Sequence, residues 1–231
     1  MIPIRDDQPR FSPPILNNCL IGLNLLIFLF ESILGPRSLQ ALFFQFGLVP
    51  SHVTGILDRG SPNLAALFVP FFTSMFLHGS WLHVLGNMWF LWIFGDNIED
   101  YLGHFKYLLF YLLSGLAAAV TQVILTPHTR VPTVGASGAI AGVLGAYFIL
   151  YPKARVLTWF PIFFLFYLPA WVMLGYWFVV QFLSGTATSI AYSGNSSGGI
   201  AFWAHVGGFA AGLIMVRIFP ERPHRYRYGT W

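Results

Sequence analysis

The sequence predicts an all-α polytopic membrane protein with six transmembrane helices. Of its 231 residues 56% are hydrophobic and only 9% are charged, whereas a soluble domain carries about a quarter charged residues. The mean hydropathy is +0.67. The apolar residues also gather in long runs, and a bilayer core of about 30 Å needs roughly 20 apolar residues per helix. Composition and run length therefore predict an integral, multi-pass membrane protein.

The first three expected spans follow a polar N-terminal segment, residues 1–14, which we expect to be cytoplasmic. Span 1 is Ile15–Leu34, and since no A-x-A-like cleavage site follows, we expect it to be retained. A long connection, residues 35–80, comes next, and its partly apolar sequence predicts a loop in the membrane interface. Spans 2 and 3 are Trp81–Asp100 and Phe105–Leu125.

The last three expected spans are joined by shorter connections. Spans 4, 5 and 6 are Ala136–Tyr151, Val156–Leu183 and Gly199–Phe219. The connection Ser184–Gly198 is rich in Gly, Ser and Thr, which predicts a mobile cap near the outer face. Residues 15–219 then form one membrane domain, and residues 220–231 form a basic cytoplasmic tail.

Lys and Arg residues set the expected orientation. With six spans, nine of these cations fall on one side and only Arg37, Arg59 and Arg130 fall on the other. The positive-inside rule then predicts that both termini are cytoplasmic. The net charge of +4 is a topology signal on this interpretation, and we expect no nucleic-acid partner. The sequence carries no signal about oligomeric state.

Four polar residues are expected at a similar depth in three spans. His83 and Asn87 lie in the first turns of span 2, Ser137 opens span 4, and His205 is about six residues into span 6. On the predicted topology all three spans enter from the outer side. Polar groups at membrane depth are costly and often functional, so this shared depth indicates a site.

Two stripes of small residues could bring Ser137 and His205 together. Span 4 carries Ser137, Ala141 and Gly145 at i, i+4 and i+8, and span 6 carries His205, Gly208 and Gly212 at i, i+3 and i+7. Small residues let membrane helices approach closely. Each feature taken alone is more often packing than catalysis, but packing alone does not explain the shared depth.

The motifs GASGAIAG, AHVGGFAAG and HGSWLHVLGNM together resemble those of the rhomboid intramembrane serine proteases. The resemblance spans the six-helix core. It implies that Ser137 is the nucleophile, that His205 is the general base, and that His83 and Asn87 help to stabilise the oxyanion. It also implies substrates that are transmembrane proteins in the lipid bilayer. Glu99 and Gly103 match the family pattern that closes span 2 as well.

Two departures from the family accompany these matches. Some rhomboids have a tyrosine four residues after the serine, on which the histidine stacks, but here this residue is Ala141. Many rhomboids also have a Trp-Arg pair in the first long loop, where this chain has Val69-Pro70. We therefore expect His205 to be oriented in another way and the loop to be anchored differently.

The resemblance implies hydrolysis of a peptide bond. We expect the catalytic unit to be a Ser-His dyad, because spans 4 and 6 contain no Asp or Glu that could complete a triad. We expect no cofactor and no metal, and the H-E-x-x-H motif of zinc proteases is absent. The main alternative is an inactive rhomboid-like chaperone that binds membrane clients. Such relatives lose the serine or the histidine, and this chain has both. A channel or transporter ranks third. The expected location is a bacterial or archaeal plasma membrane.

Overall fold

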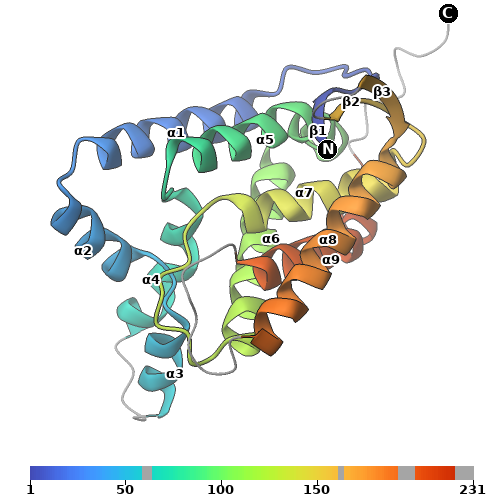
Figure 1. The fold of residues 1–231 in the computed structure, drawn as a ribbon. Helices are drawn as coiled ribbons and strands as arrows, with labels where there is room; N and C mark the ends of the chain where they lie inside the picture. Colours follow the sequence, from blue (N-terminus) through green and yellow to red (C-terminus); the bar gives the residue numbers. More distant parts are fainter. Residues whose placement is uncertain (59–63, 161–163, 192–200, 222–231) are drawn as a thin grey trace, which may run out of the picture.

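The computed structural model describes residues 1–58, 64–160, 164–191 and 201–221, most of them helical (Figure 1). The helices are α1 (Ile15–Ser32), α2 (Pro36–Phe46), α3 (Pro50–Asp58), α4 (Leu64–Thr73), a 3₁₀ turn η1 (Ser74–Phe76), α5 (Trp81–Leu102), α6 (His104–Leu125), α7 (Ser137–Leu150), α8 (Ala170–Ala191) and α9 (Phe202–Ile218). The strands are β1 (Ile2–Arg5), β2 (Arg155–Phe160) and β3 (Phe164–Pro169).

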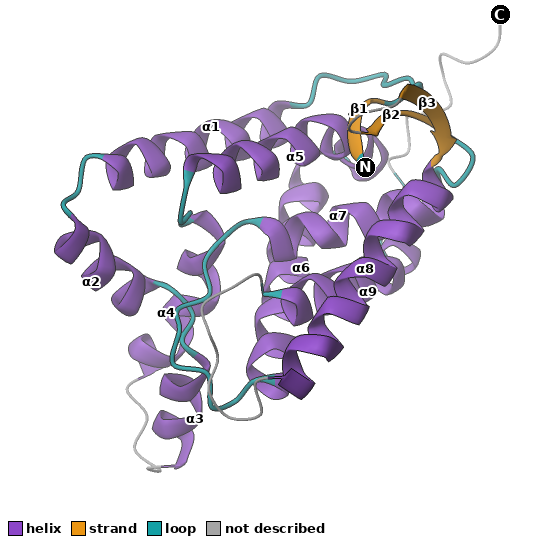
Figure 2. Ribbon diagram, in the orientation of Figure 1, coloured by secondary structure: helices purple, strands orange, loops and turns teal. Residues whose placement is uncertain are grey.

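The three strands form a small antiparallel sheet in the order β1-β2-β3, at the N-terminal edge of the bundle (Figure 2). Ile2 pairs with Trp159, and Leu157 pairs with Tyr167. The prediction of a mainly helical protein is confirmed, but the sheet was not predicted. The first half of the fifth expected span, Val156–Leu183, is wrong. Its apolar residues from Val156 to Pro169 lie mainly in the hairpin strands, and α8 begins only at Ala170.

Four of the six expected spans coincide with helices of the structure almost residue for residue. α1, α5, α6 and α7 begin within one residue of the expected starts. α9 covers the described part of the sixth span. Three helices among the described residues are long and apolar enough to cross a membrane alone: Ile15–Ser32, His104–Leu125 and Ala170–Ser189. Leu64–Phe76 and Trp81–Leu102 form a pair bent by 80°, which brings the number to four if the pair counts as one broken span. The count of six stays a prediction.

The connection of residues 35–80, expected as a loop in the membrane interface, is largely helical, and its place in the interface stays a prediction. α2, α3 and α4 lie beside the bundle, away from the sheet (Figure 1). Pro70, one of the two residues that replace the Trp-Arg pair, lies inside α4. The expected mobile cap is helical in its first part, since α8 continues to Ala191, and residues 192–198 lie outside the described ranges. So do residues 222–231 of the tail.

α7 lies at the centre of the bundle, with ten of its residues buried in an unbroken run from Gly138 to Tyr147. Glycines let α9 pack directly on it. A Cβ added at Gly212 would lie 2.0 Å from the Gly142 carbonyl oxygen, and one at Gly145 would lie 2.3 Å from the Phe209 carbonyl oxygen. The prediction that the two small stripes face each other is confirmed.

Candidate active site

The first turns of α7 and α9 bring a hydroxyl and an imidazole together. Ser137 is the first residue of α7, and His205 is in the first turn of α9. His205 Nε2 lies 2.7 Å from Ser137 Oγ, which is hydrogen-bond distance. His205 is only 8% exposed. The structure thus joins two residues that are 68 positions apart in sequence.

The close contact between α7 and α9 sets this distance. A Cβ added at Gly208 would lie 2.0 Å from the Gly138 carbonyl oxygen. Gly208 is one turn after His205, and Gly138 follows Ser137 directly. Because backbone meets backbone here, the side chains of Ser137 and His205 need to span only a short gap.

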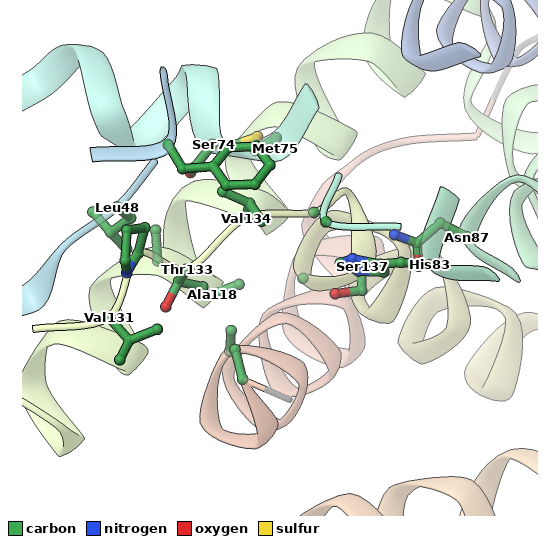
Figure 3. Close-up of a pocket in the computed structure, with 18 of the residues that line it drawn as sticks. Leu48, Ser74, Met75, His83, Asn87, Ala118, Val131, Thr133, Val134 and Ser137 are labelled. Carbon is green, nitrogen blue, oxygen red and sulfur yellow. The ribbon is translucent and has the colours of Figure 1, made fainter. Parts of the chain in front are cut away.

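His83 and Asn87 approach the same place from α5. Ser80 caps this helix, since its hydroxyl accepts the His83 backbone N–H at 3.2 Å. Both side chains line the cavity beside Ser137, and Figure 3 shows them facing it. The structure therefore groups all four sequence-predicted residues around one cavity.

Gly135 lies between the His83 ring and the start of α7. Its φ of 127° belongs to the region that favours glycine. A Cβ there would lie 2.7 Å from His83 Cε1 and Nε2. Its N–H donates to the Ser74 carbonyl oxygen at 2.8 Å. Gly135 is therefore required both for backbone conformation and for space.

The cavity has a volume of about 910 Å³ and is partly open. Its walls come from α2, η1, α5, α6, α7, the first turn of α9 and residues 131–135 (Figure 3). Small side chains lie near Ser137, including Gly115, Ala118 and Ala204. Apolar side chains such as Phe43 line the end beside α2. A cavity of this size and character can hold a peptide segment.

α7 also offers backbone donors at this place. The N-cap residue before it, Ala136, makes no side-chain cap, and the first N–H groups of a helix have no partner within it. Ser137, Gly138 and Ala139 contribute to the cavity wall. Helix N-termini favour negative charge, so this end of α7 suits a developing anion.

Three polar residues that the sequence analysis did not select also belong to the site. Gln181 of α8 lies with Oε1 2.8 Å from His205 Nδ1. Gln122 of α6 accepts the Ala204 backbone N–H at 3.1 Å and so anchors the start of α9. His78 contacts Asn87, with 3.0 Å between His78 Nε2 and Asn87 Nδ2. The available signal was that Gln122 and Gln181 are amides inside apolar runs.

No cluster of three or more His, Cys, Asp or Glu residues able to hold a metal ion occurs among the described residues. The reactive groups at the cavity include the Ser137 hydroxyl, the His205 imidazole and several hydrogen-bond donors.

Comparisons of the sequence with known proteins point to one family. The family model described as "Rhomboid domain" matches residues 65–222. Rhomboid-like protein 11, chloroplastic, of Arabidopsis thaliana is 31% identical over 66% of this chain and 53% of its own length. Rhomboid protein 1, mitochondrial, of Saccharomyces cerevisiae is 32% identical over 61% of this chain and 39% of its own.

A third relative covers more of this chain. Presenilin-associated rhomboid-like protein, mitochondrial, of Rattus norvegicus is 29% identical over 79% of this chain and 47% of its own length. This chain thus spans about half the length, or less, of these three relatives. All three names place the relatives in organelles.

Proposed function

The chain belongs to the rhomboid family, an integral membrane family, and on this premise we propose that it is an intramembrane serine endopeptidase. Its substrates are other membrane proteins, cleaved in or near their transmembrane segments. The observation that carries this proposal is the 2.7 Å contact between His205 Nε2 and Ser137 Oγ. A serine hydroxyl becomes an effective nucleophile when an adjacent base takes its proton, and this contact supplies the base.

The reaction proceeds by acyl transfer. Ser137 Oγ forms a bond to the carbonyl carbon of the peptide while its proton moves to His205 Nε2. The carbonyl electron pair moves onto oxygen to give an oxyanion. Collapse of this intermediate breaks the C–N bond, and the His205 proton goes to the leaving amine. Water then attacks the acyl-enzyme, again with His205 as base, and releases Ser137 and a carboxylic acid.

The oxyanion is stabilised by donors already present at the cavity. We assign this role to the side chains of His83 and Asn87 and to the Ser137 backbone N–H. All three residues line the cavity. Donors held in place before reaction stabilise the transition state most, because they need no reorganisation.

The membrane arrangement is part of the proposal. Six spans with both termini in the cytoplasm put the Ser137 end of α7 toward the outer face, where water can enter the cavity. The plasma membrane of a bacterium or archaeon stays a prediction, and the organelle names of the relatives give it no support. Immunolocalisation in the source cells decides it.

The deciding experiment is cleavage of a model transmembrane substrate by purified protein in detergent. We expect Ser137→Ala and His205→Ala each to lower kcat by at least about 10³-fold, since the dyad acts as a unit. Cys19→Ser is the matched control, because Cys19 is an exposed residue of α1. A fluorophosphonate probe provides a check without substrate, with labelling of the wild type and none of Ser137→Ala.

Two outcomes would redirect the interpretation. Equal cleavage by the wild type and both dyad variants would rule out the Ser-His assignment. Absence of cleavage and labelling in all of them, together with retained binding of membrane clients, would favour the chaperone instead.

A further inference from the structure

We propose that Gln181 and Trp177 of α8 are positioning residues that fix the orientation and tautomer of His205. The inference rests on the proposed function, because it concerns the base of that reaction. The sequence leaves the orientation of His205 open, since Ala141 stands where some rhomboids have a stacking tyrosine. In this chain a different helix supplies the contact.

One face of α8 is directed at α9. Trp177, Gln181 and Gly185 are spaced at i, i+4 and i+8 and so share a helix face. A Cβ added at Gly185 would lie 3.2 Å from the Trp203 ring of α9. One turn nearer the start of α8, Gln181 Oε1 lies 2.8 Å from His205 Nδ1.

Trp177 completes the contact from the next turn. Its ring centroid is 5.7 Å from that of His205, with 36° between the ring planes. Trp177 also lies 6.2 Å from the Phe209 ring, measured between centroids. The imidazole is thus held by a hydrogen bond at Nδ1 and by an aromatic ring beside it.

The Gln181 contact selects the productive tautomer. An amide oxygen can only accept a hydrogen bond, so the proton of neutral His205 is on Nδ1. Nε2 is then unprotonated and accepts from the Ser137 hydroxyl at 2.7 Å. The opposite tautomer would put a proton on Nε2, which could not act as a base.

The same pair supports His205 after proton transfer. The imidazolium keeps its Nδ1–H donated to Gln181, and hydrogen bonds from charged donors are stronger than neutral ones. The face of a tryptophan ring also attracts a cation within about 6 Å of its centroid. His205 is only 8% exposed, so bulk water contributes little to this charge.

Gln122 provides a structural contrast within the same site. Its Oε1 accepts the Ala204 backbone N–H, so it anchors the chain and not the imidazole. A buried amide near His205 therefore need not act on the ring, and the distinguishing feature of Gln181 is its contact with Nδ1.

The test compares Gln181→Leu and Gln181→Glu with the wild type in the detergent cleavage assay. Leucine removes the acceptor, and we expect kcat to fall about 10- to 100-fold with KM changed less than about twofold. Fluorophosphonate labelling should slow by the same factor. Glutamate restores an acceptor, so we expect most of the lost kcat to return. Its carboxylate favours the imidazolium, which moves the acidic limb of the pH profile to higher pH.

Thr188→Val is the matched control on α8. Thr188 is exposed, and its hydroxyl donates to the Ser184 carbonyl oxygen of its own helix, 2.8 Å away. We expect wild-type kcat, KM and pH profile from this variant. Melting temperatures in detergent show whether each variant is folded, and if Gln181→Leu is not, the pH profile of Gln181→Glu decides.

The outcomes separate this inference from the proposed function. If the wild type cleaves and a folded Gln181→Leu cleaves equally fast, Gln181 does not position the base, while the proposed protease stands. An unshifted pH profile in Gln181→Glu also overturns the inference. If the wild type neither cleaves nor labels, the proposed function itself fails, and this inference fails with it.

Discussion

Asn87 is held in place before any substrate arrives. Its Nδ2 atom donates to His78 Nε2 at 3.0 Å, and His78 Nδ1 lies 3.3 Å from the Phe76 carbonyl oxygen. His78 lies ahead of α5. These two contacts fit the neutral ring, with Nδ1 as donor to the carbonyl oxygen and Nε2 as acceptor from Asn87. One N–H of Asn87 is used by this contact, and the second is the donor that we propose for the oxyanion.

At this scale we predict that Asn87→Ala lowers kcat by about 10²-fold with little change in KM, because the donor acts on charge that develops in the transition state. The measurement is steady-state cleavage in detergent. Asn18→Ala is the matched control, since Asn18 is exposed on α1. If Asn87→Ala keeps the wild-type kcat, Asn87 does not stabilise the oxyanion.

The sequence was sufficient to find Ser137 and His205, because a serine between glycines and a histidine in an apolar span are chemically conspicuous. Gln181 was missed for a physical reason. It lies in an expected span whose register was wrong, since the first half of that span is a hairpin. Without the start of α8, neither the depth of Gln181 nor the face it shares with Trp177 could be assigned.

Among the helices, the contact between α7 and α9 determines the geometry of the dyad. We predict that Gly212→Ala destabilises the protein by about 1–3 kcal/mol, the range for added volume in a packed core. The new methyl would meet the Gly142 carbonyl oxygen at 2.0 Å, and backbone yields less easily than a side chain. Separation of the helices would also slow fluorophosphonate labelling, although Ser137 and His205 are intact.

Gly22→Ala is the control for this prediction. Gly22 lies in α1, and a Cβ there has no neighbour within 4 Å. We expect its melting temperature to equal or slightly exceed that of the wild type, because alanine is the better helix former. Equal melting temperatures for Gly212→Ala and the wild type would contradict the tight contact.

The helices that the sequence predicted well are those with long apolar runs and distinct ends. The sheet was missed because β2 and β3 are apolar on both faces, so the hairpin reads as the beginning of a span. Pro161 and Pro169 were the available signals, since proline limits a regular element. The pairing of β1 depends on contacts over about 150 residues, which local pattern cannot reveal.

Across the whole molecule, the N-terminal segment forms a clasp, because residues 3–7 hydrogen-bond to helices and to the sheet. The Trp89 indole N–H donates to the Pro3 carbonyl oxygen at 2.6 Å. The Tyr147 hydroxyl of α7 donates to Asp6, and the Arg155 backbone N–H donates to Asp7 at 2.7 Å. The segment thus joins α5, α7 and β2.

This clasp predicts a pH dependence of stability. Burial raises the pKa of Asp6 from 3.8 to about 6, so between pH 4 and pH 6 the folded state binds more protons than the unfolded state. Stability therefore falls as pH rises through this window, by about 1 kcal/mol after allowance for partial exposure. Asp6→Asn should lack this fall and melt higher than the wild type above pH 6. Parallel melting curves from pH 4 to pH 7.5 would contradict the assignment.

Because α7 is short, the thickness of the bilayer affects how deep Ser137 lies below the membrane surface. The 14 residues of α7 extend over roughly 21 Å, whereas the hydrocarbon core is about 30 Å thick. Other helices enclose α7, so its short length leaves its end below the membrane surface. Ser137 is at one such end. For the protease proposed above, acyl-chain length, which alters no atom of the protein, then sets how far water and a substrate segment travel to reach the Ser137 hydroxyl.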